Sequence, residues 1–147
     1  MTPHMADEPD DFNARVVAEF RSNGGAVGGP FEGAPLLLLH HYGARSGTER
    51  VTPLMYQEHD SRLFVFASNA GAPQHPAWYH NLRANPLITI EVATADGSIE
   101  KREVRAVDLD GDDRVSAWDR QKADVPQFAD YEASADRVIP VVELVNR

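Results

Sequence analysis

The sequence predicts a mainly β fold of the α+β class, in which six antiparallel strands form a barrel accompanied by three to four short helices. Six short segments are rich in β-branched and aromatic residues, and most of them follow one another with few helices between. Parallel strands would instead need a long, usually helical, connection between neighbours. No linker, repeat or low-complexity segment divides the 147 residues. We therefore expect one domain over residues 1–147, with an N-terminal helix and loop at 1–34 and the barrel core at 35–147.

The chain is expected to begin with an amphipathic helix that starts near Asp7 and stops at Gly24. Its apolar face carries Phe12, Val16 and Phe20, which lie at helical spacing. The following stretch is rich in glycine and is predicted to be a loop that leads into the first strand.

Six strands are predicted from runs of β-favouring residues that are bounded by turn residues. They cover residues 35–42, 49–57, 62–68, 87–93, 98–107 and 138–145. The first strand is apolar on both faces, so we expect it at the centre of the sheet. Asp96 and Gly97 separate two of the strands and predict a two-residue hairpin turn in which both residues have positive φ.

Three further short helices are predicted in the rest of the chain. They cover residues 77–84, 112–122 and 127–133. Pro76 suits the first turn of the first of these, and Asn85 followed by Pro86 ends it, because the residue before a proline avoids the helical conformation. In the second, Val115 and Trp118 are predicted to face inward.

The composition argues against several classes of function. The chain has no cysteine, which excludes thiol nucleophiles, cysteine-bound metals and disulfides. Its net charge of −9 argues against nucleic acid as a partner, because phosphate contacts need an excess of Lys and Arg. The longest apolar run, at 35–39, is far below the roughly 20 residues that cross a bilayer, and the acidic N-terminus is unlike a secretory signal. We expect a cytoplasmic protein without an integral membrane segment, and peripheral membrane contact is left open.

The histidines do not predict a metal site. His40 and His41 are adjacent on a predicted strand and so point to opposite faces of the sheet, which is poor geometry for binding one ion. His75 and His80 are five residues apart and lack the separation of four that places two ligands on one face of a helix. Packing or capping is favoured for these two, whereas His40 remains a candidate for ligand contact on the sheet face.

A glycine-flanked turn at residues 42–50 combines two arginines with two hydroxyl residues. Its sequence is Tyr42-Gly43-Ala44-Arg45-Ser46-Gly47-Thr48-Glu49-Arg50. Guanidinium groups are strong donors to phosphate and carboxylate, and glycines let backbone amides approach an anion closely. The turn therefore indicates an anion site, although a hairpin whose arginines serve only solubility has the same pattern. The turn matches neither a phosphate-binding loop, nor a dinucleotide fingerprint, nor a serine nucleophile elbow.

Four ordered motifs resemble those of a known family. They read Gly-x-Arg-Ser-Gly at 43–47, Arg-x-Thr-Pro-Leu at 50–54, Ala-Ser-Asn-x-Gly-Ala-Pro at 67–73 and Pro-x-Trp-Tyr-x-Asn-Leu-x-Ala-Asn-Pro at 76–86. This series closely resembles the deazaflavin-dependent nitroreductases of actinobacteria and the F420H2-dependent quinone reductases that are similar to them. The resemblance implies a split β-barrel like that of FMN-binding proteins, and a bound coenzyme F420, a deazaflavin with a phosphate and a glutamate-rich tail.

The resemblance also implies which residues hold the coenzyme. The implied cofactor-binding residues are Ala44, Arg45, Ser46, Arg50, Val51, Thr52, Pro53, Leu54, Met55, Phe66, Ala67, Ser68, Asn69, Ala77, Trp78, Tyr79, His80 and Asn81. Arg45 and Arg50 would anchor the phosphate and the tail, and Pro53 would stiffen the strand beside the ring. Trp78 and Asn81 lie three apart on the predicted helix and share a face. From the residues alone, a core tryptophan and a helix cap are equally good interpretations of these two.

The implied function is that of an F420H2-dependent oxidoreductase, which transfers hydride from the reduced deazaflavin to an organic acceptor such as a quinone, an enone or a nitro compound. Ser68 and Tyr131 are the catalytic candidates, as donors of a proton alongside water. Acceptor contacts are expected from the N-terminal helix and from residues 121–136. Two alternatives stay open: an oxidoreductase that uses FMN on the same barrel, and a non-catalytic protein that binds the deazaflavin or a lipophile. The exposed edges of an incomplete barrel also leave a homodimer open.

Overall fold

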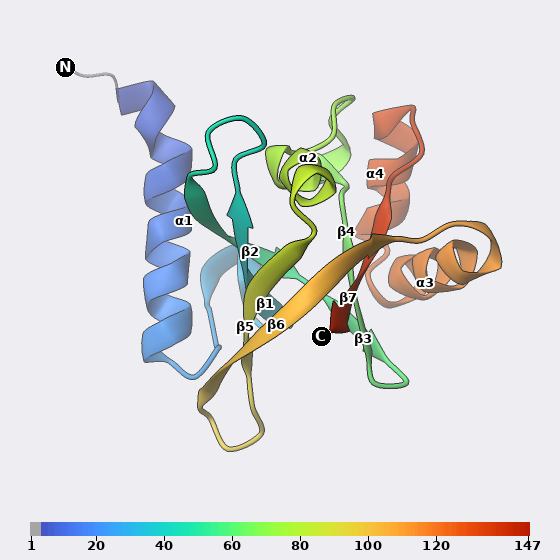
Figure 1. Cartoon of the computed structure of the whole chain (residues 1–147). Coiled ribbons are helices and arrows are strands. Elements are labelled where there is room, and N and C mark those ends of the chain that lie inside the picture. The colour runs from blue at the N-terminus through green and yellow to red at the C-terminus, as the bar shows by residue number, and fades with distance from the viewer. Residues whose placement is uncertain (1–3) are drawn as a thin grey trace.

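One antiparallel sheet dominates the computed structural model, which describes the backbone of residues 4–147 and the side chains of residues 12–29 and 31–147. The strands are β1 (Leu36–Tyr42), β2 (Glu49–Met55), β3 (Gln57–His59), β4 (Arg62–Phe66), β5 (Leu87–Ala93), β6 (Ile99–Asp108) and β7 (Val141–Asn146). Their order across the sheet is β2-β1-β5-β6-β7-β4-β3, and every neighbouring pair is antiparallel. Figure 1 shows the sheet curled around the centre of the molecule, which confirms the predicted antiparallel split barrel.

The two edge strands of this sheet are consecutive in the chain. β2 pairs with β1 as far as Met55, whereas β3 begins at Gln57 and pairs with β4 at the opposite edge. The chain therefore passes from one edge to the other at Tyr56, although the two edge strands do not pair with each other. We predicted one strand over 49–57 and six strands in all. The structure has seven, because the two halves of that segment pair with different neighbours.

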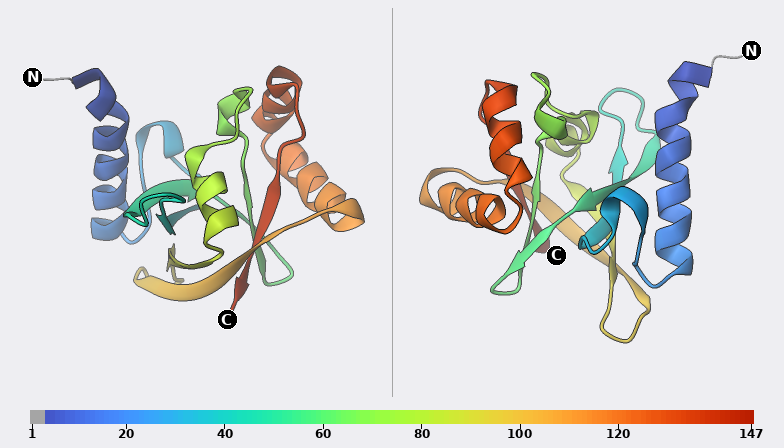
Figure 2. Two further views of the ribbon diagram at one scale, coloured as in Figure 1. Left: turned by 45° about the horizontal axis from the view of Figure 1, so that its top comes forward. Right: turned by 180° about the vertical axis from the view of Figure 1, so that it is seen from behind.

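Four α-helices surround the described part of the barrel. They are α1 (His4–Ser22), α2 (Ala77–Ala84), α3 (Gly111–Asp124) and α4 (Gln127–Ala135). Figures 1 and 2 show α1 along one flank, α3 and α4 on the opposite flank, and α2 at one end. The predicted bounds of α2 are confirmed, whereas α1 begins three residues before Asp7, and α3 and α4 each end two residues later than predicted. None of the helices within residues 4–147 is long and apolar enough to cross a membrane.

Alternate residues of the strands build separate apolar cores. Leu63 and Val65 of β4 point into the barrel, where they are buried together with Trp78 of α2. Phe64 and Phe66 of the same strand point outward and are covered by α3 and α4. This alternation is the two-residue periodicity of a strand, and it lets one strand hold two layers together.

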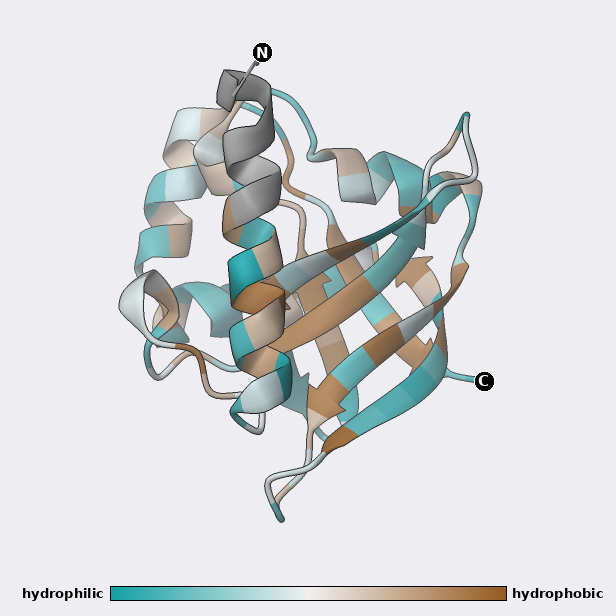
Figure 3. Ribbon diagram, turned by 90° about the vertical axis from the view of Figure 1, so that its left-hand side faces the viewer, coloured by the Kyte–Doolittle hydropathy of each residue, from teal (hydrophilic) through white to brown (hydrophobic). Residues whose placement is uncertain are grey.

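The central strand β1 is apolar on both faces for the same reason. Leu37 and Leu39 face the barrel interior, whereas Leu36 and Leu38 lie under α1 with Phe20. Figure 3 views the molecule from this side, with α1 crossing in front of strands whose apolar residues are coloured brown. Because β1 lies between β2 and β5, the prediction that this strand is central is confirmed.

Two apolar helix residues are more exposed than the sequence indicates. We predicted that Val115 of α3 faces inward, but its side chain is 49% exposed, whereas Trp118 is buried as predicted. The helix packs through Ala117, Trp118 and Gln121, and Val115 lies off that face. Phe12, at the start of the apolar face of α1, is 36% exposed.

The turn between β5 and β6 differs from the prediction, although the hairpin itself is confirmed. The amide of Thr94 donates to Ser98 O (2.9 Å), so three residues lie in the loop, and only Gly97 among them has positive φ (86°). This geometry is that of a three-residue loop with a glycine bulge. A two-residue turn with two positive φ angles occurs instead between β3 and β4, at Asp60 (53°) and Ser61 (66°).

Candidate functional site

The turn between β1 and β2 contains two backbone amides that find no hydrogen-bond partner among the residues the structure describes. Gly43 N donates to Thr48 O and Gly47 N to Gly43 O, both at 2.9 Å. Thr48 N donates to Ser46 Oγ at 3.1 Å, so this serine hydroxyl supports the turn itself. Within the described chain, the amides of Arg45 and Ser46 make no such bond. They remain available as donors to a ligand.

Arg45 and Arg50 carry the positive charge of this turn. Both side chains are exposed, and neither forms an ion pair with any residue whose side chain is described. Glu49, the acidic residue beside Arg50, contacts His40 instead, with 3.1 Å between Oε2 and Nδ1. Two uncompensated guanidinium groups on a chain of net charge −9 favour an anionic ligand at this turn.

A chain of side-chain hydrogen bonds connects the turn to β2. Asn81 of α2 accepts a bond from Ala44 N through Oδ1 (3.0 Å), and its Nδ2 lies 2.9 Å from Nδ1 of His41 on β1. The other ring nitrogen of His41, Nε2, lies 2.9 Å from Oγ1 of Thr52 on β2. Asn81 and His41 are 8% and 3% exposed. The C-cap of α2 is Asn85, so Asn81 serves this network and does not cap the helix.

His41 is the neutral member of this network. Burial lowers its pKa from 6.5 to about 4, and the charges of Arg50 and His40 add to that effect. Because a backbone N–H can only donate, the Asn81 atom that faces the turn amide is its oxygen, and Nδ2 then donates to Nδ1 of His41. The single ring proton is therefore on Nε2, which donates to Thr52 Oγ1.

A groove of about 490 Å³ runs between α1 and β2. Its lining comes from Asn13, Ala14, Val17, Ala18 and Arg21 of α1 and from Glu49, Arg50, Val51 and Thr52 of β2. The volume is within the range of small-molecule sites, and the walls combine apolar surface with two guanidinium groups. The structure thus brings the predicted residues Arg50, Val51 and Thr52 together in one cavity.

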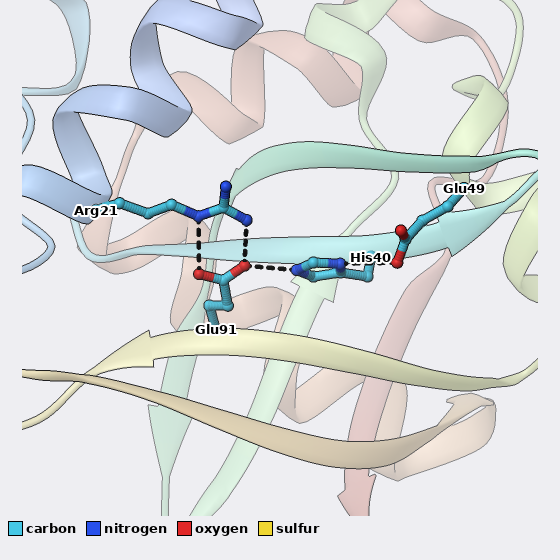
Figure 4. Close-up of polar contacts among 4 residues, drawn as sticks. All are labelled: Arg21, His40, Glu49 and Glu91. Atoms are coloured by element: carbon cyan, nitrogen blue, oxygen red, sulfur yellow. Dashed lines mark hydrogen bonds and ion pairs between the residues drawn. The ribbon is translucent and has the colours of Figure 1, made fainter.

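A charged network fixes α1 onto the sheet beside this groove, as Figure 4 shows. Arg21 donates to Glu91 twice, from Nε to Oε1 (3.0 Å) and from Nη2 to Oε2 (2.6 Å). His40 lies between two carboxylates, with Nε2 at 2.5 Å from Glu91 Oε2 and Nδ1 at 3.1 Å from Glu49 Oε2. Glu91 is only 3% exposed, and the hydrogen bond from Arg21 holds its pKa below the ordinary value. Both ring nitrogens of His40 are therefore in contact with carboxylates of this network.

Arg137, between α4 and β7, organises the loop that follows β4. Its guanidinium contacts five acceptors of that loop. These are the carbonyl oxygens of Ala67, Ser68, Ala72 and Gln74 and the Nδ1 atom of His75, at 2.9–3.2 Å. Within the same loop, Asn69 Nδ2 donates to the carbonyl oxygen of Gln74 (3.1 Å). One side chain thus determines the course of the segment that carries the predicted residues Ser68 and Asn69.

Ser68 and Tyr131, the predicted catalytic residues, lie on segments that pack together. Ser68 precedes a 3-10 turn, η2 (Asn69–Gly71), and its side chain is 8% exposed. Gly71 approaches α4 so closely that a Cβ there would lie 3.2 Å from the Cα of Tyr131. Tyr131 is half-buried and packs on Phe128, with 5.2 Å between the ring centroids. This close approach brings the two candidates into one region, which only a glycine at position 71 allows.

Several predicted cofactor-binding residues contribute to the apolar cores. The buried ones are Pro53, Phe66, Ala67 and Trp78, and the partly buried ones are Leu54 and Met55. Trp78, at 7% exposed, is a tryptophan of the barrel core. These residues can support the wall of a site through packing, but most of their surface is already in contact with protein.

Three predicted residues of α2 lie apart from the groove. Tyr79 donates its hydroxyl to Asp108 Oδ2 (2.9 Å) beside a separate cavity of about 180 Å³. His80 is exposed and lies against His75, with 5.7 Å between the ring centroids. Ala77 is exposed at the first position of the helix. The structure does not bring these predicted residues to β2.

Sequence reasoning missed three residues of this region, namely His41, Glu91 and Arg137. A usable signal exists for the first two, because each is a polar residue inside an otherwise apolar strand and must find a buried partner. Arg137 has no such signal, because most of its acceptors are backbone carbonyls of a loop more than 60 residues away.

Comparisons with known proteins show which family this sequence and fold resemble. The family model described as F420H(2)-dependent quinone reductase matches residues 13–146. An F420H(2)-dependent quinone reductase of Mycobacterium tuberculosis (strain H37Rv) is 33% identical over 132 residues, which cover 88% of this chain and 87% of that protein. A solved F420-H2 dependent reductase, FDR-A, is 33% identical, with a TM-score of 0.65 over 75% of this chain and 93% of that one. A solved domain-swapped dimer is 30% identical, with a TM-score of 0.66 over 93% of this chain and 99% of that one.

The family match covers all of the sheet and the β1–β2 turn with its two arginines. The chain therefore belongs to the F420H2-dependent quinone reductase family.

Proposed function

We propose that this chain binds reduced coenzyme F420 and catalyses the reduction of a quinone or a similar organic acceptor. The names of its relatives support this activity. The observation that carries the proposal is the β1–β2 turn, where Arg45 and Arg50 have no carboxylate partner among the described side chains. On a chain with net charge −9, two arginines that stay uncompensated are suited to an anionic ligand.

The donors of the turn fit the phosphate and the glutamate-rich tail of F420. Guanidinium groups bind phosphate and carboxylate through paired hydrogen bonds, and free backbone amides add further donors. We propose that Arg45, Arg50 and the amides of Arg45 and Ser46 hold this tail. Arg50 lines the groove together with Val51 and Thr52, and we propose that this part of β2 receives the ring while residues 53–55 support it from the core. In this proposal, Ser68 and Asn81 support the site directly, and the buried residues Phe66, Ala67 and Trp78 support it through packing.

The coenzyme supplies hydride chemistry when it is bound. The residues of the chain bind and orient the reactants and exclude water, and this positioning is their main contribution to the rate. Pro53 lacks an amide hydrogen and stiffens β2, which keeps the wall beside the ring flat. We propose that Oγ of Ser68 is the source of the proton which accompanies the hydride, with the hydroxyl of Tyr131 as the second candidate. Neither residue lines the groove, so water completes the path to the acceptor.

The groove between α1 and β2 is the proposed place of the acceptor. Ala14, Val17 and Ala18 give its α1 wall an apolar surface that suits a flat ring. Quinones, enones and nitroaromatics share that shape and an electron-poor carbon or nitrogen. Which of these acceptors binds depends on the size of ring that the α1 wall of the groove admits.

Replacing Arg45 or Arg50 by alanine is expected to weaken F420 binding by about 2–3 kcal/mol, because each substitution removes charge-assisted hydrogen bonds. Isothermal titration calorimetry measures this loss. Arg105→Ala is the matched control, since Arg105 is also exposed and lies on β6, two strands from β1. The thermal midpoint of all three variants should equal that of the wild type. If Arg45→Ala and Arg50→Ala bind F420 as tightly as the control does, these anchors are wrongly assigned.

Turnover is tested by following the absorbance of reduced F420 while a quinone, an enone or a nitroaromatic is added. Acceptor-dependent oxidation is the expected result. Binding of F420 without oxidation by any acceptor would favour the non-catalytic carrier. Binding of FMN in place of F420 would favour the flavin alternative.

Assembly and location are finer parts of the proposal. The related domain-swapped dimer supports a homodimer for this chain. Sedimentation equilibrium at micromolar concentration tests it, and the mass of a single chain would contradict it. We propose a cytoplasmic location, and co-sedimentation with lipid vesicles tests for contact with a membrane surface.

A further inference from the structure

The hydrogen-bonded chain from Ala44 to Thr52 ends on a hydroxyl that has a hydrogen left to donate. Oγ1 of Thr52 accepts from Nε2 of His41 at 2.9 Å, and no second partner of this hydroxyl occurs among the described residues. A hydroxyl group both accepts and donates. Thr52 also lines the groove beside Arg50. The spare hydrogen therefore belongs to a residue of the proposed coenzyme site.

We propose that His41 is a positioning residue of this site, which fixes the Thr52 hydroxyl as a donor to an acceptor oxygen of the coenzyme. Through its other ring nitrogen His41 holds Asn81, and Asn81 holds the amide of Ala44 at the anion-binding turn. The buried imidazole of His41 thus orients both Thr52, on the side of the deazaflavin ring, and the anion-binding turn, on the side of the coenzyme tail. This inference rests on the proposed function.

The arrangement accepts only one form of the ring. Nδ1 of His41 faces an NH2 group and Nε2 faces a hydroxyl, so the neutral ring with its proton on Nε2 satisfies both contacts. A proton on Nδ1 would point at the hydrogens of Asn81 and would force the amide to turn away from Ala44. Burial of His41 lowers its pKa to about 4 and so keeps this second proton off the ring at neutral pH.

Substitutions at position 41 separate hydrogen bonding from packing. Leucine has a similar bulk but leaves the Asn81 amide and the Thr52 hydroxyl without their partner. Glutamine carries one carbonyl and one NH2 group, so it can accept from Asn81 and donate to Thr52 as the neutral imidazole does. Glutamine should therefore restore what leucine loses.

Two acceptor oxygens of the coenzyme fit the Thr52 donor: a carbonyl of the deazaflavin ring and the phosphate of the tail. Their shared chemistry is that of a hydrogen-bond acceptor beside β2. A deazaflavin that keeps the ring and the ribityl chain but lacks the phosphate and the glutamates distinguishes them.

The experiment titrates oxidised F420 and the truncated deazaflavin into the wild type, His41→Leu, His41→Gln, Thr52→Val and the double variant His41→Leu/Thr52→Val. We expect Thr52→Val and His41→Leu each to weaken F420 binding about five- to tenfold. The double variant should bind no more weakly than His41→Leu, because the two residues act through one hydrogen bond. His41→Gln should bind within about twofold of the wild type.

His59→Leu is the matched control, because it makes the same replacement at an exposed histidine on β3 and should leave both affinities unchanged. A loss for both ligands assigns the acceptor to the ring, and a loss for F420 alone assigns it to the phosphate. Nitrogen-15 NMR of the ligand-free wild type at pH 7 provides a readout without coenzyme: Nε2 of His41 should carry the proton and Nδ1 should not.

Several results would overturn the role of His41 while leaving the proposed function in place. These are unchanged F420 affinity in His41→Leu, losses that simply add in the double variant, or a proton on Nδ1. If His41→Leu does not fold, Thr52→Val and His41→Gln still decide between the outcomes. Failure of the wild type to bind F420 at all would instead overturn the proposed function, and this role with it.

Discussion

The two adjacent histidines illustrate how one strand creates opposite environments at neighbouring positions. His40 points toward α1 and contacts the carboxylates of Glu91 and Glu49. His41 points toward α2 and contacts only neutral groups, those of Asn81 and Thr52. Successive side chains of a strand face opposite sides, so a shift of one residue in the register would exchange these environments. The same residue type is therefore a partner of charges at one position and a neutral donor at the next.

The stability of the fold should depend on pH through His41. In the unfolded chain its pKa is 6.5, whereas burial lowers it to about 4 in the fold. Above pH 6.5 the ring is neutral in both states, and as the pH falls from 6.5 towards 4 only the unfolded chain takes up the proton, so stability is lost. At about 1.4 kcal/mol for each pH unit, the loss from this residue is about 2 kcal/mol between pH 6.5 and pH 5.

Urea unfolding of the wild type and of His41→Gln across pH 5–7.5 measures this effect. Glutamine does not titrate, so its curve keeps only the contributions of the other groups, such as Glu91 and His75. Between pH 6.5 and pH 5 the wild type should lose about 2 kcal/mol more of its free energy of unfolding than His41→Gln does. A difference that stays constant over this range would show that His41 does not titrate as described.

Helix α1 is attached to the barrel by apolar contacts and by an ion pair between the half-exposed Arg21 and the buried Glu91. Val16 and Phe20 pack over β1, and Arg21 reaches the buried Glu91 of β5. A buried carboxylate that loses its cation is left with its desolvation cost and little compensation. Because α1 also forms one wall of the groove, this ion pair positions the wall against β2.

Arg21→Met is expected to lower the free energy of unfolding by about 2–3 kcal/mol, because Glu91 keeps only His40 as a partner. Chemical denaturation measures this loss. Arg102→Met is the matched control, since Arg102 pairs with Glu100 at the surface and should cost about 0.5 kcal/mol or less. Adding Glu91→Met to Arg21→Met should recover much of the loss. Equal small losses in Arg21→Met and in the control would contradict a stabilising role for the Arg21–Glu91 pair.

The whole molecule consists of one sheet with an apolar cluster inside the barrel and one on each flank. The inner cluster contains Trp78, and the cluster under α3 and α4 contains Trp118. The two share β4, whose alternate residues belong to each. Because both clusters share β4, unfolding one of them exposes apolar residues of the other and so costs free energy.

The predicted single domain can be tested with these two tryptophans. Trp118→Phe leaves Trp78 as the reporter of the barrel interior, and Trp78→Phe leaves Trp118 as the reporter of the outer cluster. Each variant is followed by fluorescence and by circular dichroism during urea unfolding. The two signals should give the same midpoint within each variant. Separate midpoints would mean that the helical flank unfolds on its own and that the chain is not one cooperative unit.

Short-range pattern was sufficient for most of the secondary structure. The bounds of α2, the hairpin between β5 and β6 and the central place of β1 all follow from caps, prolines and periodicity, which act over a few residues. The prediction of an anion site at the β1–β2 turn was likewise made from the residues of the turn alone. Such features need no knowledge of what the segment packs against.

Local patterns of this kind could not predict which distant segments pair or pack with one another. The passage of the chain at Tyr56 between the two sheet edges depends on which strands pair, and the prediction of six strands failed there. Arg21 and Arg50 look alike in the sequence, yet one is neutralised by a carboxylate 70 residues away and the other has no such partner among the described side chains. The neutral state of His41 likewise depends on burial under α2. Charge compensation and desolvation are properties of the folded neighbourhood, and the folded neighbourhood is assembled from residues that are far apart in the chain.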